Sequence, residues 1–177
     1  MRAFFLLLLF NFVFAGAMAQ DERRVGYFEN FLQVNELIDS IVVFKSKREM
    51  VTYHLGNKVK SYIISLGEEP KGKKYFEGDM RTPEGLYTIN SRDTISSYHT
   101  NLGISYPNEQ DSLFALFVGM RPGGDIKIHG FPNRHTKLQE KKFLCTDWTI
   151  GCIAVSDMEV DELYKWVIEN CHILILP

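Results

Sequence analysis

The clearest hydrophobic pattern in this chain follows Ser156. Apolar side chains recur there at spacings of three and four residues, which is the repeat of one buried face of an α-helix. They are Val160, Leu163, Tyr164, Val167 and Ile168. Ser156 and Glu159 form an S-x-x-E capping box, a sequence signal for the start of a helix. The pattern predicts a helix that begins after Ser156 and packs one side against the core.

Between positions 41 and 66, three short runs rich in apolar residues predict β-strands. The runs cover residues 41–45, 50–55 and 59–66. A charged turn separates the first two runs, and Gly56-Asn57 separates the second from the third, as in antiparallel hairpins. This part of the chain therefore predicts a three-stranded antiparallel meander.

Four later runs predict the rest of a sheet. Residues 86–90 and 126–129 have the patterns of strands, and residues 173–176 supply a strand that closes the sheet. The continuous apolar run 113–118 predicts a central strand buried on both faces. Together the elements indicate a mostly β (α+β) domain, a β-sandwich or a curled sheet, with the helix packed beside it.

Three polar segments interrupt these elements. Residues 67–82 predict a loop, residues 91–112 a long irregular stretch, and residues 131–143 a second mobile segment. An irregular stretch of that length inside a folded domain is usually functional or disordered. Its aromatic residues, Tyr98 and Tyr106, favour an ordered loop that lines a cleft.

The first 19 residues have the pattern of a secretory signal peptide. Arg2 gives the positive start, an apolar run follows, and Ala17-Met18-Ala19 is an A-x-A cleavage signal. The apolar run is shorter than the stretch of about 20 residues that a transmembrane helix needs, so we expect no membrane span after cleavage. Gln20, and not a cysteine, follows the expected cut, which argues against a lipoprotein anchor. We therefore expect an exported protein.

After the signal peptide, the sequence predicts two parts. Residues 20–40 are expected to form a helical extension, because residues 21–39 place apolar side chains roughly on one side of a helix. Residues 41–177 are expected to form one folded domain. The extension is expected to pack on the outside of that domain.

The charge of the chain is close to balanced. Lys and Arg number 20 against 22 Asp and Glu, which gives a formal net charge of −2. Proteins that bind nucleic acid or anionic membrane surfaces carry an excess of basic residues. We therefore expect neither nucleic acid nor such a surface as the partner.

The three cysteines allow several arrangements. An odd number in an exported chain leaves at least one cysteine free or paired between molecules. One solution is a disulfide between Cys145 and Cys171 with Cys152 as a reactive thiol, and the alternative is three free, partly buried thiols. A zinc site of His129, His135, Cys145 and Cys152 is a third option, but the spacings fit no compact ligand pattern, so no metal is expected.

The candidate chemistry lies at two strand ends. Cys152 follows Gly151 and precedes an apolar run and the predicted helix, while His129 ends the strand 126–129 and is followed by Gly130. A thiol and an imidazole so placed are what a cysteine nucleophile and its base require. The alternatives are an inert buried thiol and a histidine whose hydrogen bonds are satisfied at a strand end.

Four segments, in order, carry a resemblance to a known family. They are S-L-G at 65–67, G-D-M-R-T-P-E-G-L-Y at 78–87, I-H-G at 128–130 and D-W-T-I-G-C at 147–152. The set resembles the L,D-transpeptidase catalytic domain, also called the YkuD domain, over roughly residues 40–177. The resemblance implies acyl transfer on peptidoglycan stem peptides through a cysteine thioester, without a cofactor. It also implies a periplasmic or cell-wall location.

The resemblance also assigns roles to individual residues. Cys152 would be the nucleophile and His129 the general base, with the carbonyl of Gly130 bonded to the imidazole. Backbone N–H groups around Gly151 and Cys152 would stabilise the oxyanion. Thr149 would orient the loop through its hydroxyl group.

Four further residues are candidates for contact with the substrate. They are Arg81, Tyr106, Asp147 and Trp148. Arg81 is suited to bind a carboxylate of the acidic stem peptide through two hydrogen bonds; the alternative is a local ion pair with Asp79 or Glu84. Asp147 and Trp148 are expected to shape the wall of the site, although Trp148 is equally suited to the core.

One position departs from the family pattern, and it bears on the acceptor. Ile150 stands where the common signature has a second histidine, which marks a divergent D-W-T-x-G-C subgroup. The acceptor is therefore open: a peptide or protein amine would make the protein an L,D-transpeptidase, and water would make it an L,D-carboxypeptidase or a cell-wall amidase. A non-catalytic wall-binding domain is a third hypothesis, which the intact Cys152 and His129 disfavour.

Overall fold

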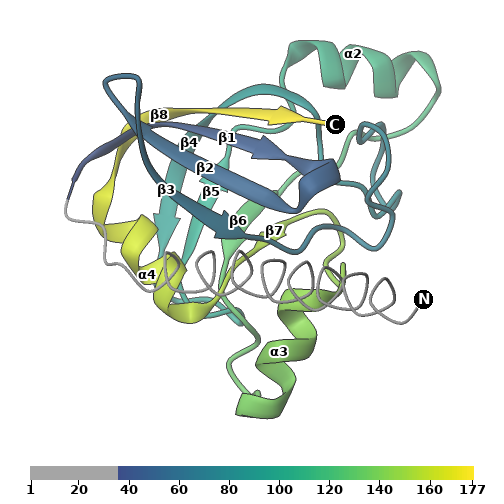
Figure 1. Ribbon diagram of the computed structural model, residues 1–177. Helices are drawn as coiled ribbons and strands as arrows, with labels where there is room; N and C mark the ends of the chain where they lie inside the picture. Colours follow the sequence, from purple (N-terminus) through teal and green to yellow (C-terminus); the bar gives the residue numbers. More distant parts are fainter. Residues whose placement is uncertain (1–35) are drawn as a thin grey trace, which may run out of the picture. The chain divides into compact units, whose positions relative to one another are not determined.

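In the computed structural model, eight strands of the described part of the chain, residues 36–177, join in one mixed sheet (Figure 1). The strand order is β3-β2-β1-β8-β4-β5-β6-β7. The strands are β1 (Ile38–Phe44), β2 (Glu49–His54), β3 (Asn57–Ile63), β4 (Gly85–Asp93), β5 (Asn101–Ile104), β6 (Lys127–His129), β7 (Ile153–Ala154) and β8 (Val167–Leu176). The helices are α2 (Glu109–Phe117), α3 (Lys137–Cys145) and α4 (Asp157–Trp166), with a 3-10 turn η1 (Lys45–Lys47).

The predicted meander is confirmed. Strands β1, β2 and β3 pair antiparallel in chain order, and Leu55 and Gly56 turn the chain between β2 and β3 with positive φ angles of 49° and 80°. Glycine adopts such angles without steric cost, which suits the tight connection. Residues 67–82 connect the meander to β4 without a helix or a named strand, as predicted for a loop.

The N-terminal predictions fall mostly outside the described residues. The signal peptide lies there entirely, as does the helix predicted for residues 21–39 up to residue 35. The end of that helix prediction is wrong, because Ile38 and Asp39 belong to β1. Ile38 pairs with β8 and is completely buried, so sheet pairing decides its conformation here.

The last strand lies at the centre of the sheet. The sequence predicted a strand over residues 173–176, but β8 is longer and runs between β1, to which it is parallel, and β4, to which it is antiparallel. Val167 and Ile168, which continued the helical spacing after Leu163, are the first residues of β8. The helix predicted after Ser156 is confirmed as α4, with the capping box of Ser156 and Glu159 present.

The region before β6 differs most from the predictions. Residues 113–118 were expected to form a central buried strand, but they lie mostly in α2, which begins after a capping box of Asn108 and Asp111. Leu116 and Phe117 are 73% and 86% exposed, so this run is not a core element. An apolar run of this length fits either a strand or a helix, and the capping residues decide in favour of the helix.

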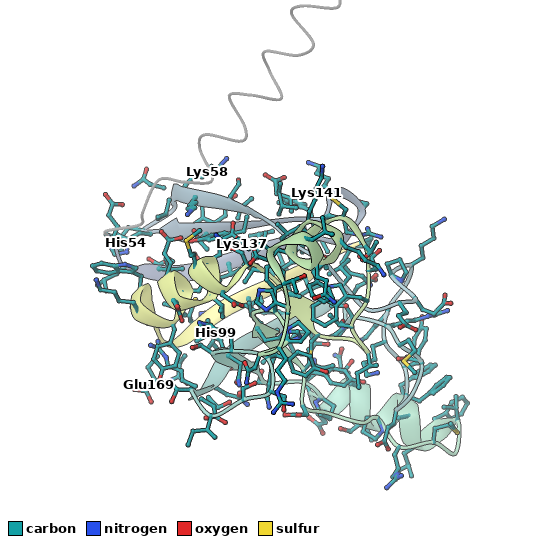
Figure 2. All side chains as sticks on the ribbon, turned by 90° about the horizontal axis from the view of Figure 1, so that it is seen from below. His54, Lys58, His99, Lys137, Lys141 and Glu169 are labelled. Atoms are coloured by element: carbon teal, nitrogen blue, oxygen red, sulfur yellow. The ribbon has the colours of Figure 1, made fainter. Side chains whose placement is uncertain are left out.

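Two further elements lie in segments that were expected to be irregular. Strand β5 lies within residues 91–112, and all four of its residues are buried. Helix α3 covers most of residues 131–143, and the Gln139 side chain accepts a hydrogen bond from the Thr136 N–H at its start. Its exposed lysines include Lys137 and Lys141 (Figure 2). These elements contain few residues, which leaves their periodicity too weak to detect.

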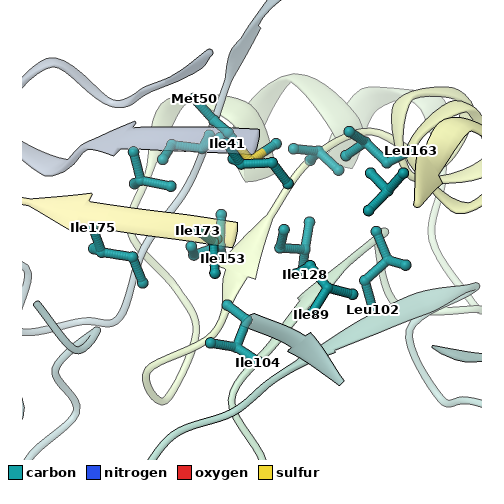
Figure 3. Packing of buried hydrophobic residues seen from close by; sticks show 14 of the residues in the cluster. Ile41, Met50, Ile89, Leu102, Ile104, Ile128, Ile153, Leu163, Ile173 and Ile175 are labelled. Atoms are coloured by element: carbon teal, nitrogen blue, oxygen red, sulfur yellow. The ribbon is translucent and has the colours of Figure 1, made fainter. Parts of the chain in front are cut away.

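The core lies inside the curl of the sheet, as Figure 3 shows from close by. Met50 of β2, Leu102 of β5 and Ile173 of β8 all contribute to one buried cluster. Leu163 of α4 joins the same cluster, which fixes the helix against the sheet. The prediction of a mostly β, curled sheet with a helix after Cys152 is therefore confirmed.

The packing of α4 gives a stability prediction. Leu163 is completely buried, so Leu163→Ala leaves a cavity and should lower the free energy of unfolding by about 2–5 kcal/mol. Urea denaturation followed by circular dichroism measures the change. Met158→Ala is the matched control on the exposed side of α4 and should change the free energy by less than about 0.5 kcal/mol. Equal effects of the two substitutions would contradict this account of the core.

Candidate active site

Strand β6 and the residue that precedes strand β7 carry the two candidate catalytic side chains on one face. Strands β6 and β7 pair in parallel, with Ile128 opposite Ile153 and His129 opposite Ala154, and Cys152 directly precedes β7. Side chains alternate between the faces of a sheet. Because Ile128 and Ile153 are completely buried in the core, His129 and Cys152 lie together on the other face.

A backbone contact fixes the orientation of His129. Its Nδ1 lies 2.7 Å from the carbonyl oxygen of Gly130, the contact that the resemblance implied. A carbonyl can only accept a hydrogen bond, so Nδ1 carries the hydrogen, and Nε2 of the neutral ring is left as the basic atom. Gly130 has no room for a side chain, because a Cβ there would clash with Asp157 and His99.

Aromatic rings enclose the imidazole. The Tyr98 ring centroid lies 4.9 Å from that of His129, and the Trp148 centroid lies 5.6 Å from it. The indole N–H of Trp148 donates to the carbonyl of Phe143, and the two rings of that pair are 4.9 Å apart. These contacts leave His129 only 5% exposed. The site therefore has an aromatic wall formed by Tyr98, Trp148 and Phe143.

Burial sets the protonation states of both groups. It lowers the pKa of His129, which the bond to Gly130 opposes and the positive charge of Lys127 reinforces. Burial raises the pKa of the Cys152 thiol, although the Lys127 N–H and the charges of Lys127 and Lys74 act in the opposite direction. The resting pair is therefore a neutral thiol and a neutral imidazole. The thiol donates to the carbonyl of Asp125 over 3.6 Å.

The hydroxyl group of Thr149 stabilises the loop before Cys152. Thr149 Oγ1 donates to the Cys152 carbonyl over 2.8 Å and accepts the Gly151 N–H over 3.2 Å. The backbone of Thr149 bonds to Leu66 and Glu68 on the other side. The N–H of Gly151 is therefore already engaged within the loop.

Glycines allow the loop to approach its neighbours closely. Gly151 has a φ of 132°, and a Cβ on it would lie 2.8 Å from the Arg81 carbonyl oxygen. A Cβ on Gly67 would clash with the Met80 carbonyl oxygen. The main chain therefore packs directly against main chain at both positions, and a side chain would force the segments apart.

The Asp147 carboxylate forms hydrogen bonds within the protein. Its carboxylate accepts two hydrogen bonds from Arg48, at 2.9 Å from Nε to Oδ1 and 2.6 Å from Nη2 to Oδ2, and a third from the Leu66 N–H. Both carboxylate oxygens are thus hydrogen-bonded to Arg48 or Leu66. Tyr106 is also committed elsewhere, because it is buried in the core and donates its hydroxyl hydrogen to the Pro122 carbonyl.

Arg81 has neither of the local partners considered for it. Asp79 pairs with Lys74 at 2.7 Å, and Glu84 pairs with Lys45 at 2.8 Å. In residues 36–177 the Arg81 guanidinium has no ion pair. Its own backbone carbonyl faces Gly151, so the residue borders the loop that carries Cys152.

Two residues near the site had no assigned role in the sequence. The sequence marked Tyr98 only as an aromatic residue of a loop that lines a cleft. Its contact with the His129 ring is visible only in the folded structure. Lys74 is buried, and its charge acts on the Cys152 thiol. Burial alone would raise the pKa of Asp79, but its bond to Lys74 and three backbone N–H groups lower it overall. In the sequence, the motif at 78–87, which contains Asp79, was the feature that pointed to the Lys74–Asp79 pair.

The cysteines are all free thiols, so the arrangement with a disulfide between Cys145 and Cys171 is wrong. Cys145 is exposed at the end of α3, whereas Cys171 is completely buried on β8 at the centre of the sheet (Figure 1). The fold therefore separates a surface thiol from a core thiol. In the described part of the chain, no group of His, Cys, Asp or Glu side chains could hold a metal ion.

Comparisons with known proteins agree on one family. The family model for the L,D-transpeptidase catalytic domain, YkuD, matches residues 38–175. YafK of Escherichia coli K12, named as a proposed L,D-transpeptidase, is 25% identical over 171 residues, which cover 92% of this chain and 61% of YafK. The chain thus spans about three fifths of this curated relative.

Solved structures share the fold. The helical cell shape determining protein Pgp2 of Campylobacter jejuni has a TM-score of 0.58 at 24% identity, over 80% of this chain and 48% of Pgp2. Bd1075 of Bdellovibrio bacteriovorus has a TM-score of 0.56 at 19% identity, over 81% and 52%. An L,D-transpeptidase of Mycobacterium smegmatis has a TM-score of 0.51 at 12% identity, over 77% and 58%. The chain spans about half the length of these structures.

The lowered pKa of His129 predicts how stability depends on pH. An ordinary histidine has a pKa of about 6.5 in the unfolded chain, so the unfolded state binds the proton more readily than the folded state. His129 therefore contributes stability above about pH 6.5 that is lost as the pH falls through its folded pKa. His129→Gln should lose less stability than the wild type between pH 7 and pH 5.

Urea denaturation at several pH values measures this difference. His172→Gln, at an exposed position on β8, controls for the loss of a histidine as such. Parallel stability curves for His129→Gln and the wild type would show that His129 is not held neutral by burial.

The contact of Arg48 with Asp147 gives a second prediction. Asp147→Ala removes the acceptor for the Leu66 N–H as well as for Arg48, and should lower the free energy of unfolding by about 1–3 kcal/mol. Because the two side chains act as a pair, Arg48→Ala in the Asp147→Ala background should cost less than it does alone. A double-mutant cycle by urea denaturation measures the coupling, and additive effects would contradict it.

Proposed function

Because this chain belongs to the L,D-transpeptidase catalytic domain (YkuD) family, as its four ordered motifs indicated, we propose that it modifies cell-wall peptidoglycan. In this proposal, Cys152 takes an acyl group from a stem peptide and holds it as a thioester. One observation carries the proposal: Cys152 and His129 lie on the same sheet face, and the bond of Nδ1 to Gly130 leaves Nε2 as the base.

The first half of the proposed reaction forms the thioester. The Cys152 proton moves to His129 Nε2 as Sγ attacks the carbonyl carbon of the third stem-peptide residue. Because both groups are neutral at rest, this proton transfer accompanies the attack. The tetrahedral oxyanion then collapses, the bond to the terminal D-residue breaks, and the imidazolium gives its proton to the departing amine.

The oxyanion requires donors that the resting site does not use. The Gly151 N–H is bonded to Thr149, so we assign the oxyanion to the Cys152 N–H rather than to that of Gly151. Thr149 then acts by fixing the loop, since it bonds both the Gly151 N–H and the Cys152 carbonyl.

The second half releases the acyl group. An amine of a peptide or protein, or water, attacks the thioester carbonyl and gives a proton to Nε2, and the departing thiolate recovers a proton from the imidazolium. An amine acceptor makes the protein an L,D-transpeptidase, which is the function we propose. With water as the acceptor, the same site performs L,D-carboxypeptidase or amidase chemistry.

Two residues of the site are proposed to contact the stem peptide. Arg81 is a cation without an ion pair in the described residues, which suits a substrate carboxylate; its backbone carbonyl borders the Cys152 loop, and its guanidinium lies beside Gly72. Trp148 offers an aromatic surface beside His129. Ile150 is 71% exposed and is assigned no proton transfer.

A peptidoglycan substrate also implies a location. We propose that the protein is exported to the periplasm or the cell wall, with residues 1–19 as its signal peptide. Within the part of the chain that the structure describes, none of the helices has the length and apolar character to cross a membrane.

The test of the proposal is covalent capture. Wild-type protein incubated with a stem peptide, or with a carbapenem as a strained cyclic acyl donor, should gain the mass of the acyl group on Cys152. Cys152→Ala should gain nothing while keeping its circular dichroism spectrum, because removing one sulfur atom changes little packing. Ile150→Ala should still be acylated, because its exposed side chain takes part in no proton transfer.

Intact-protein mass spectrometry followed by peptide mapping identifies the acylated residue. An adduct on Cys145 or Cys171, or turnover by Cys152→Ala, would overturn the assignment. Adding a peptide amine and analysing the products then separates transfer to an amine from hydrolysis.

A further inference from the structure

Asn101 on β5 is an unusual buried side chain. It is 1% exposed, and neither its carboxamide oxygen nor its nitrogen has a hydrogen-bond partner. The other buried polar atoms in this situation have a charged neighbour, because His54 Nδ1 lies 3.5 Å from Asp39 and Asp111 Oδ1 lies 2.7 Å from Lys73. Within residues 36–177, Asn101 is thus the one buried side chain left with no polar partner. Buried amides are normally satisfied, so this one requires an explanation.

The sheet register directs Asn101 toward the catalytic pair. In the antiparallel pairing of β5 and β6, Asn101 stands opposite His129, and Leu102 stands opposite Ile128. Leu102 and Ile128 are both completely buried in the core, so Asn101 and His129 share the other face. Directly opposed residues have Cβ atoms about 4.5–5.5 Å apart. Asn101 is therefore a side neighbour of His129 on the face that also carries Cys152.

The charged and titratable groups around the imidazole do not include a bound carboxylate. On the same face are Lys127 of β6, whose charge lowers the pKa of His129, the Cys152 thiol and the Tyr98 hydroxyl. Asp93 is opposite Asn101 on β4 and is exposed. Asp157 of α4 lies behind Gly130, where it accepts the Phe131 N–H. The groups at hand therefore give an imidazolium little support.

The catalytic cycle creates a need that the carboxamide can meet. When Nε2 takes the thiol proton, a cation forms in a buried aromatic site whose one fixed acceptor is the Gly130 carbonyl. A carboxamide dipole beside the ring, with no other hydrogen bond to break, can turn its oxygen toward that cation. An apolar residue at this position would avoid the cost of burying an amide, but it would supply no such dipole.

We propose that Asn101 is a positioning residue that stabilises the protonated form of His129, by presenting its carboxamide oxygen to the imidazolium as Cys152 gives up its proton. The catalytic role given to Asn101 rests on the proposed function. Its physical content, an effect of Asn101 on the proton equilibrium of the Cys152–His129 pair, is independent of any substrate.

Two substitutions at this position should act in opposite directions. Asn101→Leu keeps the volume and removes the dipole, so His129 should titrate at lower pH. Alkylation of Cys152 by iodoacetamide should then move to higher pH and slow by about tenfold near neutrality, since one pKa unit corresponds to a factor of ten. Asn101→Asp places a negative charge beside the ring and should shift both profiles the other way.

The experiment uses the full chain without substrate. NMR titration of the histidine ring signals gives the pKa of His129, and peptide mapping after alkylation separates Cys152 from Cys145. Thr100→Val is the matched control, because Thr100 is the preceding buried residue and its hydroxyl bonds Asp161 on α4. The control should leave both profiles unchanged.

The outcomes separate this inference from the proposed function. Unchanged profiles in Asn101→Leu, or the same shift in Thr100→Val, would overturn the role of Asn101 even if the wild type is acylated by stem peptides. Opposite shifts in the two Asn101 variants would support the role even if stem peptides fail to acylate Cys152. Should Asn101→Asp fail to fold, Asn101→Leu alone still decides the matter.

Discussion

The position of Cys152 depends on three backbone segments that touch without intervening side chains. Gly67 packs on the Met80 carbonyl and Gly151 on the Arg81 carbonyl, while Ser65 and Ala154 exchange both backbone hydrogen bonds. Contacts of this kind leave little freedom, because moving one segment would break hydrogen bonds in the next. Cys152 is thus held in place by main-chain contacts, and the motifs at 65–67, 78–87 and 147–152 form one contact region.

Three basic side chains tie this region to the rest of the domain. Lys45 bonds the carbonyls of Gly72 and Thr82 and pairs with Glu84, and so ties the middle of the loop before β4 to its end. Lys74 forms an ion pair with Asp79, and Arg48 forms one with Asp147. The carboxylates in these motifs therefore organise the loops, and the proposed reaction uses only a thiol and an imidazole. Burial lowers the pKa of His129 and raises the pKa of Cys152, so attack in the proposed reaction depends on proton transfer from the thiol to the imidazole.

The elements that were predicted well are those specified by neighbouring residues in the sequence. The capping box of Ser156 and the apolar spacing through Leu163 specify α4, and the meander follows from short strands and a tight turn. The conformation of Ile38 was predicted wrongly, because its strand depends on pairing with the distant β8. The motifs marked Cys152 and His129 as candidates and predicted the Gly130 contact, which is confirmed, but the position of Asn101 beside His129 comes from the register of β5 on β6. No local pattern marks Asn101 or Tyr98 as partners of the imidazole, and the free Cys145 and Cys171 show that cysteine parity alone does not define a bridge.

The bond between His129 Nδ1 and Gly130 has a consequence for the order of events. With one nitrogen held by the main chain, the ring has a single atom, Nε2, through which protons enter and leave. In the proposed reaction, the amine that departs and the nucleophile that replaces it therefore occupy the same place beside Nε2, one after the other. The proposed reaction would then be a double displacement, in which the first product leaves before the second substrate binds, and the two substrates compete for the free form of the protein.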